Sequence, residues 1–140
     1  MTIPAAVIFD VREGLFCLMG DATQGLDQAL VRPDRELHPE WFEADRELLG
    51  RAFALLDVIG WSAGSEPAKV DVDVGQHGGT LKDALDGYLP LLEDQEKDAD
   101  IDDRRRAAEG KPLRKQEISN RLLACREFAA LLERRVRELA

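Results

Sequence analysis

The sequence predicts an all-α protein, an antiparallel bundle of about four helices with one short extended segment between the second and third helices. Four stretches carry apolar residues at helical spacing, and only one short stretch alternates with period two. Apolar residues make up 44% and charged residues 34% of the 140, which fits a chain with a core. Amphipathic helices cannot bury their apolar faces alone, so we expect one domain, 1–140, with helices near 4–19, 39–59, 80–96 and 113–139.

The first predicted helix, 4–19, can be capped by Thr2 and stopped by Gly20. An alternative is a strand at 6–11, because that stretch is rich in residues that favour strands. The following residues, 20–38, are polar and broken by Gly20, Gly25 and Pro33, and we interpret them as a connection, with a short turn of helix at 26–31 as an option. The apolar face of the helix consists of Val7, Ile8, Val11, Leu15, Leu18 and Met19.

The second predicted helix begins at Pro39, a residue suited to a first helical position, and ends at Gly60. After it, valines alternate with aspartates from Val70 to Val74, which is typical of a short extended segment with one wet face. That segment can pair with a second copy of the chain, with residues 5–10, or with nothing.

The third predicted helix starts at Thr80, which forms a capping-box pattern with Asp83, and Pro90 should kink or restart it. The fourth carries a sustained heptad seam with spacing 4,3,4,3,4,3. The seam consists of Ile118, Leu122, Cys125, Ala129, Leu132, Val136 and Leu139.

Charge divides the chain into an acidic body and a basic last helix. Residues 1–103 hold 8 Lys+Arg and 23 Asp+Glu, giving −15, and residues 104–140 hold 11 and 5, giving +6, which sum to −9. This balance argues against general nucleic-acid or anionic-membrane binding. Lys111, Arg114 and Lys115 crowd the positive N-terminus of the last helix, and we expect the acidic run 93–103 to offset them.

The chain has no secretory signal pattern and no uncharged run of the length that a membrane-spanning helix needs. Its two cysteines, Cys17 and Cys125, lie in apolar runs, which indicates reduced thiols and a cytoplasmic location.

The strongest ligand-binding candidate is the glycine-rich segment 75–80, read as a loop before a helix. Its predicted residues are His77, Gly78, Gly79 and Thr80, whose free amide groups at a helix N-terminus would suit an anion. The plain alternative is a turn with an ordinary threonine cap.

Metal sites receive weaker support, and we predict no metal and no cofactor. Asp71, Asp73 and His77 could meet a divalent ion, but alternating acids on a wet face are common. The run from Asp98 places carboxylates as a calcium loop does, but Asp103 stands where that loop needs glycine.

Arg32 and His38 have a spacing that resembles the Arg-x(4–6)-His pattern of the HEPN family of helical ribonucleases. Pro33 and Pro39 interrupt the helix on which that family carries the pair, so its activity is not carried over.

The favoured function is a cytoplasmic, non-enzymatic protein-interaction module that acts through helix packing as a homodimer. Its predicted interface is the seam residues Ile118, Leu122, Cys125, Leu132, Val136 and Leu139, or the 39–59 helix if the bundle covers the last one. The alternative is a small-ligand-binding or hydrolase domain that uses the 75–80 segment or a helix-borne acidic cluster of Glu43, Asp45, Glu47 and Asp57.

Overall fold

The structure is a computed structural model that describes residues 1–61 and 69–139. The predicted all-α fold with four helices is confirmed. In chain order the elements are β1 (Thr2–Pro4), α1 (Ala5–Leu30), the short 3-10 helix η1 (Arg35–Leu37), α2 (Glu40–Ile59), β2 (Lys69–Asp71), α3 (Val74–Ala108) and α4 (Lys115–Glu138).

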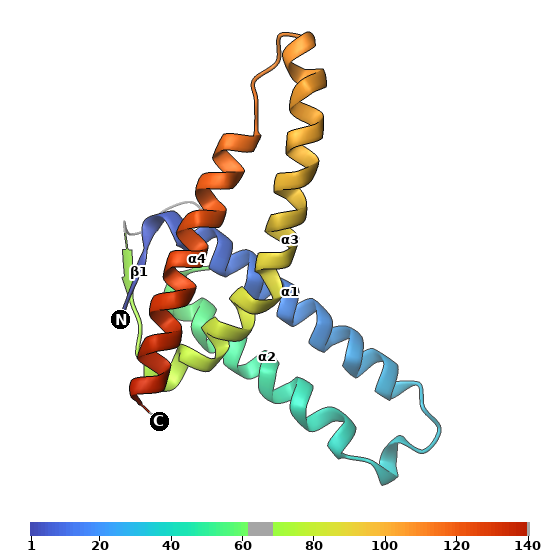
Figure 1. The fold of residues 1–140 in the computed structure, drawn as a ribbon. Coiled ribbons are helices and arrows are strands. Elements are labelled where there is room, and N and C mark those ends of the chain that lie inside the picture. Colours follow the sequence, from blue (N-terminus) through green and yellow to red (C-terminus); the bar gives the residue numbers. More distant parts are fainter. Residues whose placement is uncertain (62–68, 140) are drawn as a thin grey trace.

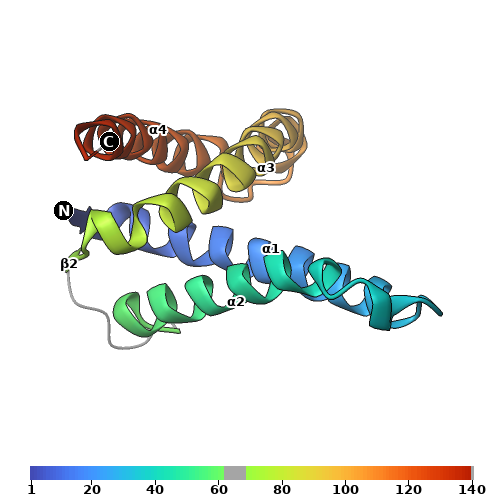
Figure 2. The same cartoon turned by 90° about the horizontal axis from the view of Figure 1, so that it is seen from below.

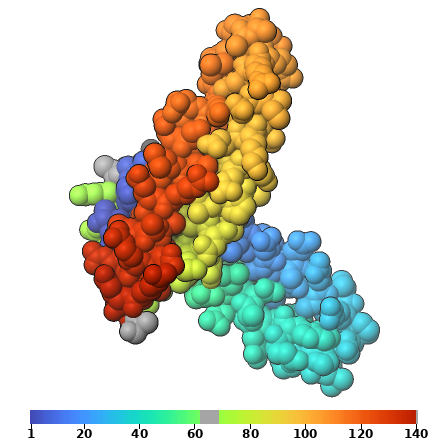
Figure 3. All heavy atoms as spheres, in the orientation of Figure 1, coloured from blue at the N-terminus to red at the C-terminus, as the bar shows by residue number. Residues whose placement is uncertain are grey.

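The helices form two hairpins, α1–α2 and α3–α4, that cross near their bases and diverge (Figure 1). The view from below shows that α1 lies between α2 on one side and the α3–α4 hairpin on the other (Figure 2). The space-filling view shows the hairpin ends as two arms that point away from each other (Figure 3). Among the residues that the structure describes, a hydrophobic core fills the crossing and draws side chains from all four helices and both strands.

Helix α1 is longer than the sequence predicted. It is a helix, not a strand, but it continues through Gly20 and Gly25 to Leu30, so most of the expected connection 20–38 is helical. Each interior glycine costs about 1 kcal/mol of helix propensity, and packing against α2 offsets that cost. Ala22 and Ala29 are buried, and Gly25 leaves room for the Asp45 carboxylate of α2.

The extended segment forms half of a small antiparallel sheet. β2 pairs with β1, with Ile3 opposite Val70, so its partner is neither a second copy nor residues 5–10. The N-terminal ammonium donates to the Val72 carbonyl oxygen at 3.0 Å. The segment is also shorter than predicted, because α3 has already begun at Val74.

Helix α3 begins six residues before Thr80, so the capping role expected of Thr80 is wrong. The cap is Asp73, whose carboxylate accepts from the Gly75 amide at 2.9 Å. The helix contains Pro90, changes direction about midway (Figure 1), and continues through the acidic run to Ala108. Helix α4 begins two residues later than predicted.

The two hairpins touch most closely where α1 crosses α3. An ideal Cβ on Gly14 would lie 2.7 Å from the Ala84 carbonyl oxygen and 3.3 Å from its methyl group. Neither neighbour is a flexible side-chain end, so only glycine permits this approach.

We therefore expect Gly14→Ala to lower the free energy of unfolding by about 1–3 kcal/mol, because the helices must separate. Urea denaturation followed by circular dichroism measures the change. The control is Gly20→Ala, since nothing lies within 4 Å of that Cβ position. The control should be neutral or stabilising by up to about 1 kcal/mol. Equal behaviour of the two variants would contradict the close crossing.

Candidate functional site

A buried polar cluster joins three helices at the crossing. Asp10 of α1 is 1% exposed, and its carboxylate accepts from Arg121 Nη2 of α4 at 2.6 Å and from the Tyr88 hydroxyl of α3 at 2.9 Å. The guanidinium of Arg121 also lies 5.2 Å from the centre of the Phe9 ring. A buried carboxylate needs such partners, so this cluster stabilises the position of α4 against α1 and α3.

The Tyr88 hydroxyl and the Cys125 thiol both lie next to the Asp10 carboxylate. Burial, with Asp10 nearby, raises the pKa of the Cys125 thiol to about 12 and raises that of the Tyr88 hydroxyl as well. Both groups therefore stay neutral at physiological pH, and Cys125 lacks the thiolate character of a nucleophile. Among the described residues, every buried side-chain nitrogen and oxygen has a hydrogen-bond partner.

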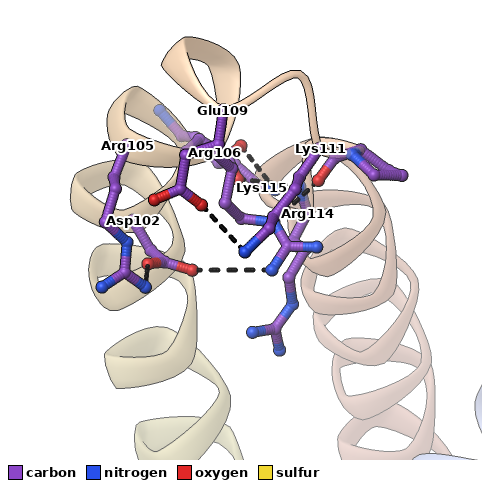
Figure 4. Close-up of polar contacts among 9 residues, drawn as sticks. Asp102, Arg105, Arg106, Glu109, Lys111, Arg114 and Lys115 are labelled. Carbon is purple, nitrogen blue, oxygen red and sulfur yellow. Dashed lines mark hydrogen bonds and ion pairs between the residues drawn. The ribbon is translucent and has the colours of Figure 1, made fainter.

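The tip of the α3–α4 hairpin holds a second polar cluster (Figure 4). The Asp103 carboxylate of α3 accepts from the backbone amides of Arg114 at 2.9 Å and Lys115 at 3.0 Å, so it caps α4 from across the hairpin. Lys115 Nζ also lies 3.0 Å from the Asp100 carboxylate. The acidic run thus offsets the basic start of α4 within one chain, and the two amide bonds hold the pKa of Asp103 below its usual value.

We expect Asp103→Ala to reduce thermal stability at pH 7, because the first amides of α4 lose their acceptor. A carboxylate whose pKa is lowered by folding stabilises the folded state at pH values above its unfolded-state pKa. That contribution is lost as the pH falls through its folded-state pKa. The gap in melting temperature from wild type should therefore close as the pH falls below about 3.8. Asp98→Ala, an exposed acid on the same helix, is the control and should change little. A gap of the same size at acid and neutral pH would contradict the capping role.

The predicted ligand residues do not form a loop. His77, Gly78, Gly79 and Thr80 lie in the first two turns of α3, where backbone amides after the first turn bond within the helix. The His77 amide itself donates to the Asp73 carbonyl oxygen at 2.8 Å. Gly78 is buried and faces Val136 of α4. The free amides assumed at this segment are thus not there, and anion binding stays an untested prediction.

The predicted interface residues face the chain's own core. Ile118, Leu122, Cys125 and Leu132 are each at most 4% exposed, Val136 packs at the core's edge, and Leu139 is 62% exposed. The heptad seam of α4 is therefore covered by α1 and α3, and the expectation of an open seam is corrected. The second predicted surface, on α2, keeps Phe53 and Val58 exposed.

Three aromatic side chains meet on the outside of the α1–α2 hairpin. The Trp61 ring lies 5.4 Å from Phe53 of α2 and 6.4 Å from Phe16 of α1, measured between ring centres. All three are between 36% and 43% exposed. We call Phe16, Phe53 and Trp61 the aromatic surface.

The sequence alone did not identify the aromatic surface, because Trp61 lies beyond the end of α2. Gly60 has a φ of +93°, which turns the chain so that Trp61 folds back onto the helix. Arg12 holds the turn by donating from Nε to the Gly60 carbonyl oxygen at 2.9 Å. The Trp61 indole donates to the Asp57 carboxylate at 2.8 Å. The glycine directly before a tryptophan was the available signal.

The two residues of the HEPN-like spacing, Arg32 and His38, both contact Trp41. Trp41 lies between the His38 ring, 4.1 Å away, and the Arg32 guanidinium, 4.6 Å away, so both residues of the HEPN-like spacing contact an indole at the α1–α2 tip. Within the described part of the chain, no group of three or more His, Cys, Asp or Glu residues is arranged to hold a metal ion.

Comparison of the chain with protein-family models, with curated proteins and with solved structures finds no match. In residues 1–61 and 69–139, none of the helices combines the length and the apolar character needed to cross a membrane.

Proposed function

We propose that this chain is a non-enzymatic protein-interaction module of the cytoplasm that acts through helix packing as a homodimer. The observation that carries the proposal is the aromatic surface. Large exposed apolar clusters on a folded chain are typical of interfaces, and aromatic residues are enriched there. Two free cysteines fit a reducing compartment.

The completeness of the core supports the same proposal. The seam of α4 is already covered and the buried polar side chains described are satisfied, so the fold does not need a partner to bury them. The aromatic surface is different, because its rings remain open to solvent after folding. Covering it would stabilise an assembly by the hydrophobic effect.

A ligand-binding role is the second candidate, and one cavity favours it. A cavity of about 340 Å³ lies beside the Asp10–Arg121 pair and is lined by Ala6, Phe9, Asp10, Glu117 and Arg121. The aspartate and the arginine already form an ion pair with each other, so few of their hydrogen-bonding atoms are free to bind a ligand.

We expect wild-type protein to elute with a mass near twice 15.6 kDa in light scattering coupled to size exclusion. Phe53→Ser should shift the mass toward one chain, because it removes one of the three rings of the aromatic surface. Leu37→Ser is the matched control, since Leu37 is 79% exposed but lies in η1, away from the surface. A wild-type mass of one chain at high concentration would refute the homodimer.

A further inference from the structure

One stripe of α2 faces outward along the whole helix and continues to Trp61. Its five members within α2 are spaced by four, four, three and four residues, which places them on one helical face. Trp61 follows the end of α2 and reaches the same face through its hydrogen bond to Asp57 and its contact with Phe53. The middle four are exposed, and the face lies away from the buried side that holds Ala52, Leu55, Leu56 and Ile59. The outward stripe consists of Phe42, Arg46, Gly50, Phe53, Asp57 and Trp61.

The stripe carries two opposite charges that do not neutralise each other within the chain. Arg46 lies over the Phe42 ring at 5.3 Å and forms no ion pair among the described residues. Asp57 accepts the indole N–H of Trp61 and has no cationic partner there. The two residues are eleven positions apart on the helix, roughly 16 Å, which is too far for them to pair with each other.

The order of residues in the stripe is self-complementary. If two copies of α2 run antiparallel about a two-fold axis between positions 51 and 52, each residue i lies opposite residue 103 − i of the other copy. Arg46 then faces the partner's Asp57, and Gly50 faces the partner's Phe53. Phe42 then lies toward the end of the partner's α2, where the partner's Trp61 packs on its own helix. Opposite charges meet, a small residue meets a large one, and the symmetry makes each contact twice.

We propose that the occupant of this surface is a second copy of the chain, bound by antiparallel pairing of α2 in that register. The proposal rests on the proposed homodimer and specifies its interface. A parallel pairing would place Arg46 beside Arg46 and Phe53 beside Phe53, so the pattern favours the antiparallel orientation. Charges placed in this way select both the partner and the register.

Gly50 gives independent support. Glycine in a helix interior costs about 1 kcal/mol relative to alanine, and nothing in the chain lies within 4 Å of its Cβ position. Packing inside the fold therefore does not require glycine here. Gly50 instead lines a cavity of about 240 Å³ between α2 and the start of α3, which Glu47, Arg51, Ala54, Gln76 and His77 also line. In the proposed register the partner's Phe53 lies over the Gly50 side of this hollow.

Charge reversal tests the register. Arg46→Glu brings two carboxylates together at each of the two Arg46–Asp57 contacts of the dimer, and Asp57→Arg brings two guanidinium groups together. Each single variant should raise the dimer dissociation constant about tenfold or more in sedimentation equilibrium at low salt. The double variant restores opposite charges and should recover most of the wild-type affinity. Circular dichroism on each variant checks that α2 is intact.

Filling the hollow tests the small-to-large contact. Gly50→Leu should raise the dissociation constant while leaving the fold at least as stable, because leucine is the better helix former. Gly79→Leu is the matched control, an exposed helical glycine on α3 with nothing within 4 Å, and it should leave the dimer unchanged.

The outcomes separate this proposal from the homodimer itself. The antiparallel register is overturned, while the homodimer stands, by either of two results. One is a dimer dissociation constant that neither single charge reversal changes, and the other is a double variant that dimerises no more tightly than the single variants. A wild-type chain that stays monomeric at high concentration overturns both.

Discussion

The ion pair between Asp10 and Arg121 is the contact on which the arrangement of the two hairpins depends. It joins residues 111 positions apart, and Tyr88 completes it from a third helix. Burying a charge is costly unless it is paired, so α4 can lie on α1 only in the position that brings Arg121 to Asp10. One turn along α1, Gly14 admits the backbone of α3. Together these contacts set the crossing from which both arms diverge.

The sequence is informative where a helix is defined by its own apolar periodicity, and much less so at the ends. The buried faces of α2 and α4 can be predicted because apolar residues recur at helical spacing over several turns. Gly20 is typical of a helix end, but α1 continues beyond it because α2 packs against the following residues. Thr80 resembles a helix cap. The cap actually used is Asp73, which the alternation of valine and aspartate assigns to an extended segment instead. In each case a local signal competes with a partner distant in sequence.

The candidate surface is harder to predict than the fold. A heptad seam shows that a helix has a partner but not whether that partner is its own chain, and here α1 and α3 cover the seam of α4. The aromatic surface requires Trp61 to fold back through Gly60 onto residues of two helices, a contact that no spacing rule along one helix contains. The acidic run is predictable as the partner of the basic helix start, because charge and proximity in sequence both indicate it. The choice of Asp103 as the cap requires the geometry of the hairpin.

A double-mutant cycle on the Asp10–Arg121 pair tests most directly whether this contact holds the crossing. The free energy of unfolding is measured at fixed protein concentration for wild type, Asp10→Leu, Arg121→Met and the double variant. Arg121→Met alone should cost about 3–5 kcal/mol, because it leaves a buried carboxylate unpaired. The double variant should be less destabilised than the sum of the single variants by at least about 2 kcal/mol. Additive losses within about 0.5 kcal/mol would contradict the account.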